Sequence, residues 1–362
     1  MYSVIKQICI LTALIALTAC GSTAKKPANT STELNTTNSY EEHQKVIESD
    51  NAEEHAAIHR EKHESKHKAK HMAKHASKHQ QKHAEKHQHP NTKVGNYLKV
   101  VTWNVEHLAY PIDKGCRPRT PEELAKLQAY AKGLDADIVA LQEVASKSAV
   151  HLLFPAEEWT VIISGRPDSP SYDCRGNGFK STQQKLAFAV KKPLNVFGVK
   201  SLVDLSLNRI GLRYGLEITV ETSKGMTDIL NVHLKSGCFV DDYYDRDTHA
   251  CRLIKRQVPV MQNWIAEQNK SNTPYIILGD FNHRISIPYN RMTRKLKGTD
   301  DDLSIATKDV KGCHPRYPIP IDHVVVGNMD GAMARMTAKV YAFEDMRENA
   351  MLSDHCAVAV TL

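Results

Sequence analysis

The chain has 362 residues, of which 41% are hydrophobic, 25% charged and 6% aromatic, enough for one large domain or two modest ones with a sizeable core. No apolar run reaches the roughly 18–20 residues of a membrane-spanning helix, so a polytopic membrane protein is excluded, and the apolar residues after position 98 exclude a wholly disordered chain. The formal net charge of +7 is compatible with a phosphate-bearing substrate without requiring one.

The N-terminal segment has the organisation of an export signal. Lys6 precedes an apolar run over 8–17, and the run ends in Leu17-Thr18-Ala19-Cys20. This end resembles a bacterial lipobox, in which the cysteine is acylated and becomes the mature N-terminus. We expect 1–19 to be a lipoprotein signal peptide and Cys20 to anchor the protein in the lipid membrane, with an ordinary secretion signal as the alternative. The two residues directly after Cys20, Gly21 and Ser22, include no aspartate, which favours the outer membrane, at its periplasmic or surface face.

Export also changes how the cysteines are interpreted. Cys9 is removed with the signal and Cys20 is assigned to lipid, which leaves six cysteines. In an oxidising compartment these six favour disulfides, and they allow fifteen pairings. Cys238 and Cys251 are close in sequence and are the first pair that we expect. No Cys-x-x-Cys spacing occurs, which argues against a zinc ribbon. The six are Cys116, Cys174, Cys238, Cys251, Cys313 and Cys356.

Two polar segments follow the signal. Residues 20–53 are rich in Thr, Ser, Asn and Lys and are typical of a solvated linker. Over 54–90 a histidine recurs every four residues, from His55 to His87, among helix formers that build no hydrophobic face, so we expect a disordered or single-helix tether. Neighbouring histidines could chelate Zn²⁺, Ni²⁺ or Cu²⁺. A spacer is the favoured role; a metal-binding arm and a pH-dependent polycation remain open.

Residues 96–362 are expected to form one domain. A helix over 120–134 begins with a capping box at Thr120 and Glu123, and a second helix over 250–268 has apolar residues at helical spacing. Many short β-rich runs with few helices predict an α/β or α+β sandwich of stacked sheets. The expected strands are 98–103, 138–141, 159–163, 186–190, 212–220, 229–234, 275–278, 323–326, 335–341 and 356–362.

Carboxylates, amides and imidazoles lie at the ends of six of these runs. Carboxylate and amide oxygens are hard ligands that suit Mg²⁺, Mn²⁺ or Ca²⁺ rather than zinc. A cation held by Glu143, with help from Asn104 or Asp354, could neutralise a phosphoryl oxygen. A single strand that ends in a polar residue is a common surface feature, but six of them together indicate a catalytic or metal-binding site. The six segments are 102–106, 141–144, 231–237, 279–283, 321–324 and 352–356.

The same segments also offer an acid–base pair. A histidine hydrogen-bonded to an aspartate can take a proton from water, and Asp322 with His355 would be that pair. Asp280 and Asn282 would position the water, and His233 would stabilise the pentavalent phosphorus centre. The pattern predicts hydrolysis of a phosphoester.

This ordered set resembles the endonuclease/exonuclease/phosphatase superfamily, which has the deoxyribonuclease I-like fold, over about 98–362. The resemblance implies a four-layer αββα sandwich with the site at one edge of the sheets. It implies Glu143 as the principal metal ligand and Asn104 beside it. Glu106 lies where some members place a second acidic ligand, and Asp354 belongs to the terminal Ser-Asp-His motif.

The resemblance implies catalytic roles as well. His355 would be the general base and Asp322 its orienting partner, although some accounts make the equivalent of Asp280 the base. His233 matches the phosphate-contacting histidine, and Asp280 and Asn282 match the pair in the Gly-Asp-Phe-Asn motif.

The substrate is less sharply indicated. Arg166 and Lys185 are candidate phosphate contacts, and a basic cluster over 291–297 could bind a nucleic-acid backbone. We expect a monomeric, membrane-anchored, Mg²⁺-dependent nuclease that acts on DNA, RNA or both. The alternative is a phospholipid-headgroup, sphingomyelinase-like or other small phosphoester hydrolase. A non-enzymatic metal-binding lipoprotein is disfavoured, because none of the expected catalytic residues is missing.

Overall fold

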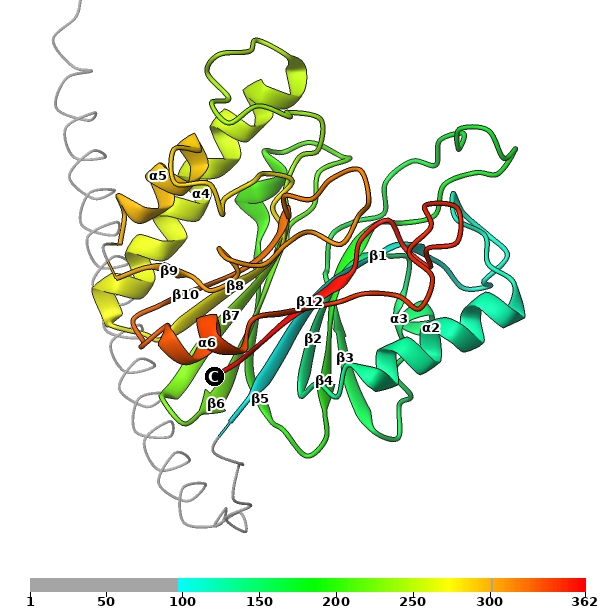
Figure 1. Ribbon diagram of the computed structural model, residues 1–362, viewed down its shortest axis with the longest axis horizontal. Helices are drawn as coiled ribbons and strands as arrows, with labels where there is room; N and C mark the ends of the chain where they lie inside the picture. The colour runs from blue at the N-terminus through cyan, green and yellow to red at the C-terminus, as the bar shows by residue number, and fades with distance from the viewer. Residues whose placement is uncertain (1–96, 301) are drawn as a thin grey trace, which may run out of the picture. The chain divides into compact units, whose positions relative to one another are not determined.

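The computed structural model describes residues 97–300 and 302–362. The expectations for the signal peptide 1–19, for Cys20, for the linker 20–53 and for the tether 54–90 lie outside these residues. The described part contains two six-stranded sheets (Figure 1). Within it, no helix combines the length and the apolar character needed to cross a membrane.

The first sheet has the strand order β11-β12-β1-β2-β4-β3. Its neighbours β1 and β2 run parallel, and every other pair in it is antiparallel. The parallel pair places the carboxyl ends of two consecutive strands at the same edge. The strands are β1 Lys99–Leu108, β2 Ile138–Val144, β3 Trp159–Ile163, β4 Lys185–Lys191, β11 Lys339–Tyr341 and β12 Ala357–Thr361.

The second sheet has the order β5-β6-β7-β8-β10-β9, and it repeats this feature, because β7 and β8 are its parallel pair. The remaining neighbours are antiparallel. In each sheet, therefore, the carboxyl ends of two central, parallel strands lie at the same edge. The strands are β5 Val196–Leu202, β6 Gly215–Thr222, β7 Gly225–His233, β8 Tyr275–Asp280, β9 Ser304–Ile305 and β10 Asp322–Gly327.

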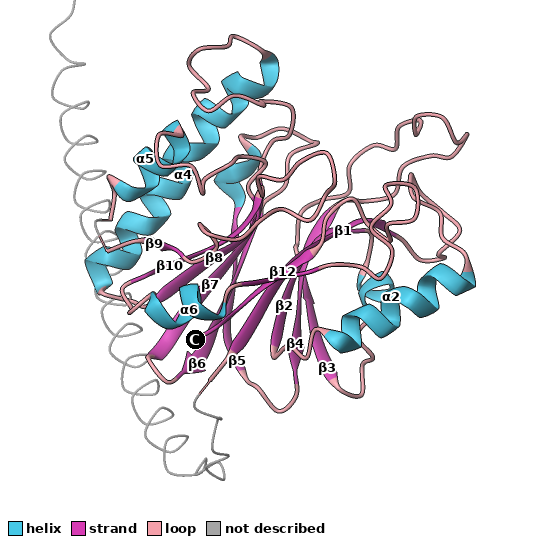
Figure 2. Ribbon diagram, viewed as in Figure 1, coloured by secondary structure: helices cyan, strands magenta, loops and turns pink. Residues whose placement is uncertain are grey.

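Helices cover the outer faces of the two sheets (Figure 2). α2 (Pro121–Gly133) lies against the first sheet and begins with the predicted capping box, and α4 (His249–Ser271) lies against the second. Between the sheets, apolar side chains such as Phe188 and Leu278 form a buried layer. The result is the expected four-layer αββα sandwich. The other helices are α3 Lys147–His151, η1 Val203–Ser206, α5 Arg291–Lys297 and α6 Ala332–Thr337.

Some expected elements differ from the structure. The strand expected over 335–341 is wrong in its first part, because helix α6 continues to Thr337 and β11 begins only at Lys339. The strand expected over 212–220 begins at Gly215. β5 was not expected, since an exposed edge strand lacks the continuous apolar run of a buried one. The short helices α3 and α5 likewise present too few turns for a periodic pattern to be visible.

A buried polar bridge joins the two sheets. The Nε2 of Gln142 in β2 donates to the Oδ1 of Asn231 in β7 at 2.8 Å, and the Nδ2 of Asn231 donates to the carbonyl oxygens of Leu141 and Ala187 at 3.0 Å each. Thr102 completes the bridge through its contact with Gln142. Because buried polar groups are costly unless they are paired, this bridge fixes how one sheet lies on the other.

Three disulfides join the six cysteines of the described residues. The structure pairs Cys238 with Cys251, the pair that the sequence favoured, across a separation of 13 residues. The other two disulfides span longer separations, 58 and 43 residues, which the sequence could not assign. They are Cys116–Cys174 and Cys313–Cys356.

Candidate active site

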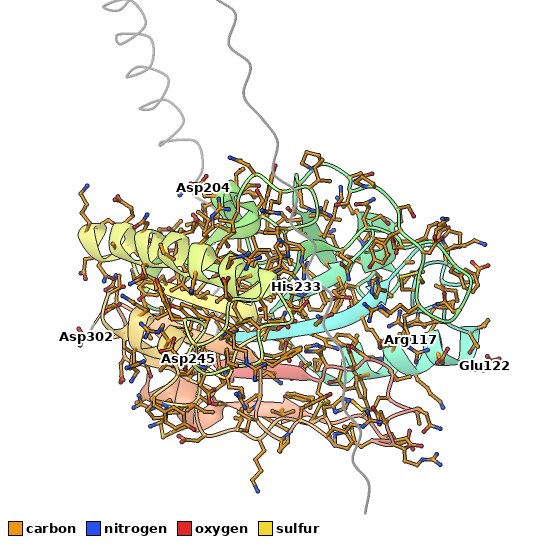
Figure 3. The ribbon with its side chains drawn as sticks, turned by 90° about the horizontal axis from the view of Figure 1, so that it is seen from above. Arg117, Glu122, Asp204, His233, Asp245 and Asp302 are labelled. Carbon is orange, nitrogen blue, oxygen red and sulfur yellow. A yellow bond between two sulfur atoms is a disulfide. The ribbon has the colours of Figure 1, made fainter. Side chains whose placement is uncertain are left out.

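Most of the predicted catalytic residues meet at the edge where the two parallel pairs end. His233 and Asp280 are the last residues of β7 and β8 and are paired in register. Asp322 opens the antiparallel strand β10 opposite Asp280. Seen from above in Figure 3, His233 lies near the centre of the molecule. Strand register alone therefore brings residues from distant parts of the chain together.

Asp280 is the hub of this cluster and is 1% exposed. Its Oδ2 accepts hydrogen bonds from the Nδ2 of Asn104 at 3.3 Å and of Asn282 at 3.0 Å, and its Oδ1 accepts the backbone N–H of Asn282 at 2.7 Å. The Nε2 of His233 lies 3.3 Å from Oδ2. Gly279 must precede Asp280, because a Cβ at its φ of +145° would lie 1.9 Å from the carbonyl oxygen of Val232.

His355 forms the expected pair with Asp322. Its Nδ1 lies 2.6 Å from Asp322 Oδ2, and its Nε2 lies 3.9 Å from Asp280 Oδ2. An N–H on Nδ1 that donates to Asp322 leaves the Nε2 lone pair directed toward the cluster. The ring is held in place through its backbone, since His355 N–H donates to Ser353 Oγ and Trp103 Nε1 donates to His355 O.

The carboxylates around His355 control its protonation. Burial of the imidazole opposes protonation, but the charges of Asp322 and Asp280 outweigh it and raise the pKa of His355 well above 6.5. Burial also raises the pKa of Asp280 to about 7, with His355 opposing the rise and Asp322 adding to it. One ligand atom from each of these three residues lies within 4.8 Å of the others.

Glu143 meets the requirements of a metal ligand. It follows the end of the apolar part of β2 with a φ of +61°, its side chain is 14% exposed, and its Oε1 lies 3.8 Å from His233 Nε2. No hydrogen bond reaches its carboxylate from any residue that the structure describes. A nearly buried carboxylate without donors is matched by a cation, and the oxygen donors of Glu143 and Asp280 suit a hard divalent ion. The residues present therefore fit such a metal.

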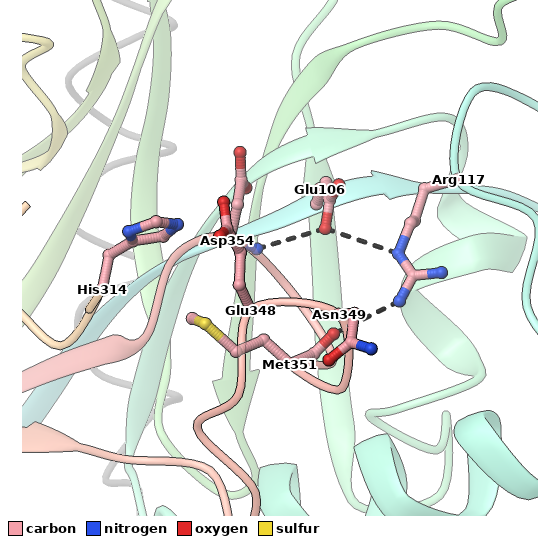
Figure 4. A pocket seen from close by; sticks show the side chains of 7 residues that line it. All are labelled: Glu106, Arg117, His314, Glu348, Asn349, Met351 and Asp354. Carbon is pink, nitrogen blue, oxygen red and sulfur yellow. Dashed lines mark hydrogen bonds and ion pairs between the residues drawn. The ribbon is translucent and has the colours of Figure 1, made fainter. Parts of the chain in front are cut away.

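Glu106 and Asp354 lie next to each other, and Asp354 precedes His355 in the chain. They line an adjoining cavity of about 460 Å³ together with Arg117 (Figure 4). Glu106 Oε2 accepts the backbone N–H of Asp354 at 3.1 Å and lies 3.5 Å from Arg117 Nε. Burial and the nearby charge of Asp354 raise the pKa of Glu106 to about 7. Asp354 Oδ1 lies 3.9 Å from His355 Nε2. The side chain of Asn104 is fully used, because its Nδ2 donates to Asp280 Oδ2 and its Oδ1 accepts the backbone N–H of Glu106.

The two predicted phosphate contacts, Arg166 in the loop between β3 and β4 and Lys185 at the start of β4, are both held by residues of that loop. Arg166 is buried and contacts Gln183 Oε1 at 3.4 Å. Lys185 forms an ion pair with Asp168 at 2.7 Å. The structure does not place either cation in contact with Asp280 or Glu143.

A cation that the sequence analysis missed does reach the cluster. Arg213 precedes β6, and its guanidinium contacts His233 Nε2. Burial lowers the pKa of Arg213, while the charges of Glu143 and Asp280 act to raise it. Burial, followed by the charge of Arg213, lowers the pKa of His233 well below 6.5, so this imidazole is neutral at pH 7. No motif marks Arg213 in the sequence, and only its position beside His233 reveals it.

Residues 101–355 match the profile of the Endonuclease/Exonuclease/phosphatase family. The chain belongs to this family. Its members are divalent-metal-dependent phosphoester hydrolases, so this family member is a metal-dependent enzyme that acts on phosphoric ester bonds. No curated protein matches the chain.

Solved structures show where the family fold recurs. The human Nocturnin catalytic domain with a bound sulfate anion is similar with a TM-score of 0.52 and 17% identity, over 74% of this chain and 94% of that chain. A humanized TDP2 from D. rerio is similar with a TM-score of 0.50 and 13% identity, over 74% and 99% of the two chains. At such identities the likeness concerns the fold, and it confirms the deoxyribonuclease I-like sandwich of this family member.

Proposed function

We propose that this family member is a nuclease that hydrolyses phosphodiester bonds in DNA, RNA or both, with His355 as the general base. The observation that carries the proposal is the contact of 2.6 Å between His355 Nδ1 and Asp322 Oδ2. It leaves Nε2 free to accept a proton from water beside Asp280. The raised pKa of His355 makes Nε2 a stronger base than an ordinary imidazole, and it also means that only the neutral fraction of His355 can accept the proton.

The other residues act on the water and on the phosphoryl group. Asp280 and Asn282 form one hydrogen-bonded unit that positions the water. Neutral His233 and the half-buried cation of Arg213 stabilise the negative charge that develops on the phosphoryl oxygens. Mg²⁺, which Glu143 would hold with Asn104 near it, supplies additional charge neutralisation when bound, and Mn²⁺ shares its ligand preference.

Nucleic acid is the substrate that we favour. The family name includes endonucleases and exonucleases, and the chain carries a net charge of +7. Helix α5 adds basic residues after the Gly-Asp-Phe-Asn motif, although Arg291 and Arg294 there form ion pairs with Asp242. The proposal includes monomeric action and attachment to the outer membrane through acylated Cys20, with the histidine-rich tether as a spacer.

A substrate panel tests the proposed function. The purified full chain, in detergent, is incubated with plasmid DNA, RNA, sphingomyelin, inositol phosphates and bis-p-nitrophenyl phosphate, with His355→Asn as the matched inactive control. We expect cleavage of DNA or RNA that EDTA abolishes and that Mg²⁺ or Mn²⁺ restores. Hydrolysis of sphingomyelin or inositol phosphates in preference to both nucleic acids would instead establish the phospholipid or small-phosphoester alternative.

A further inference from the structure

A strained bulge near the end of β1 turns the consecutive side chains of Glu106 and His107 in different directions. The register with β2 shifts between Asn104 and Leu108, and Glu106 and His107 have φ angles of +45° and +56°. This left-handed conformation is uncommon for residues other than glycine and persists only where neighbours enforce it. It directs Glu106 toward the cavity beside Asp354 and directs His107 toward Glu143.

Arg119 stabilises the bulge through hydrogen bonds to backbone carbonyl oxygens. Its Nη2 donates to the carbonyl oxygens of Val105 at 2.7 Å and Glu106 at 2.8 Å, and it reaches Leu352 O at 3.3 Å. The guanidinium is buried, and burial lowers the pKa of Arg119 to about 10. An arginine buried to hold three carbonyl oxygens fixes the direction in which His107 leaves the strand.

His107 lies between a carboxylate and an amide. Its Nε2 is 3.6 Å from Glu143 Oε2 and 3.2 Å from the side-chain nitrogen of Gln184. Its Nδ1 is buried and has no partner among the residues that the structure describes. A proton on Nδ1 would be buried and unsatisfied, whereas a proton on Nε2 faces the Glu143 carboxylate. This Nε2–H tautomer requires the planar Gln184 amide to be turned end for end, so that its oxygen accepts from His107 where its nitrogen now stands.

The Glu143 carboxylate lies between two imidazoles. Its two oxygens face one imidazole each, Oε1 toward His233 at 3.8 Å and Oε2 toward His107 at 3.6 Å. His107 itself does not belong to a ligand group. In the described part of the chain, Asp280, Asp322 and His355 are the one set of three whose ligand atoms lie mutually within 4.8 Å.

We propose that His107 is a positioning residue, which orients the Glu143 carboxylate for a divalent cation and is itself held by Gln184. The inference rests on the proposed function, because it takes Glu143 as the metal ligand. Groups that orient a metal ligand typically contribute 10–100-fold to metal affinity or activity. The histidine therefore acts on the metal through Glu143 and does not contact the substrate.

His107→Asn is the variant that tests the proposal. Asparagine tolerates a left-handed φ, so the bulge is kept, but its side chain is too short to reach Glu143. We expect the Kd for Mg²⁺, measured by calorimetry on the full-length protein, to rise about 10–100-fold. Activity should return when Mg²⁺ is raised to saturation, with an unchanged KM for the diester substrate. His107→Gln, which keeps a donor, should restore part of the affinity.

His151→Gln is the matched control, because this half-buried histidine lies on α3 and contacts Phe154 O instead of a carboxylate. An unchanged Mg²⁺ affinity in His107→Asn overturns the proposal. So does a loss of Zn²⁺ binding with unaltered Mg²⁺ binding, which would make His107 a direct ligand. Because the readout is metal binding, failure of the nuclease assignment appears separately, as wild-type protein that binds Mg²⁺ and leaves DNA and RNA intact.

Discussion

Protonation of His355 and of Asp280 cannot be treated separately, because the two nearly buried side chains shift each other's pKa. The charge of Asp322, also nearly buried, raises the pKa of both. A mutation at one of them therefore changes both the rate and its dependence on pH.

Asp322→Asn separates these two effects. Removal of the Asp322 charge lowers the pKa of His355, and the base must be neutral to accept a proton, so the acidic limb of kcat/KM against pH should move to lower pH. The maximal rate should fall about 10²–10⁴-fold, because the Nδ1–H of His355 loses its carboxylate partner. A pH–rate profile on bis-p-nitrophenyl phosphate measures both changes. A limb at the wild-type pH would show that His355 is not the titrating base.

Arg213 gives a second prediction at this scale. Arg213→Gln removes the half-buried cation beside His233, and we expect kcat to fall about 10²–10³-fold, as when a donor to a developing oxyanion is lost. Arg213→Lys keeps the charge and should retain part of the rate. Steady-state kinetics of both variants at saturating metal tests this, and wild-type turnover in Arg213→Gln would remove the residue from the site.

Strand ends, at the scale of elements, explain why so much of the site is visible in the sequence. Buried strands are short apolar runs, and the polar residue that closes each run must lie at a sheet edge, so His233, Asp280 and Glu143 could be recognised. The order of the motifs then indicated the family. The αββα layers followed from this resemblance more than from periodicity, since β5 and the short helices were missed.

Two other site features could not be predicted from local patterns. Arg213 lies in a loop and becomes relevant only because β6 pairs with β7, which ends in His233. His107 points toward Glu143 because Arg119 holds a left-handed bulge, and a pattern of alternating residues would have continued β1 without one. Both depend on contacts between residues far apart in the chain, which sequence periodicity does not report.

The bridge between the sheets supports a prediction about stability. Asn231→Leu removes the Asn231 donor from the carbonyl oxygens of Leu141 and Ala187 and buries an apolar side chain against the amide of Gln142, which keeps its bonds to Thr102 and Ala140. Each buried polar group that loses its partner costs about 1–3 kcal/mol. We expect a loss of several kcal/mol in the free energy of unfolding, measured by urea denaturation. Asn269→Leu, which removes a single hydrogen bond to Thr299 O, should cost far less. Equal losses in the two variants would contradict the role of the bridge.

Stability of the whole molecule should depend on its crosslinks. Paired serine substitution at Cys116 and Cys174, which close 58 residues, should lower the free energy of unfolding by about 2–5 kcal/mol. The same change at Cys238 and Cys251, which close 13 residues, should cost less, because a shorter loop restricts the unfolded chain less. Denaturation of both variants with and without reductant compares them, and the reverse order would show that native contacts rather than chain entropy dominate.

The third crosslink carries a consequence for the producing cell. Cys356 directly follows His355, so the Cys313–Cys356 bond tethers the backbone beside the general base to a distant loop. In the reducing cytosol, where thiols stay unpaired, a newly made chain lacks this tether. If the chain is a nuclease, we expect it to reach full catalytic activity only after it leaves the cytosol and the Cys313–Cys356 bond forms. Nucleic acid inside the producing cell would then meet an enzyme whose general base is less firmly held.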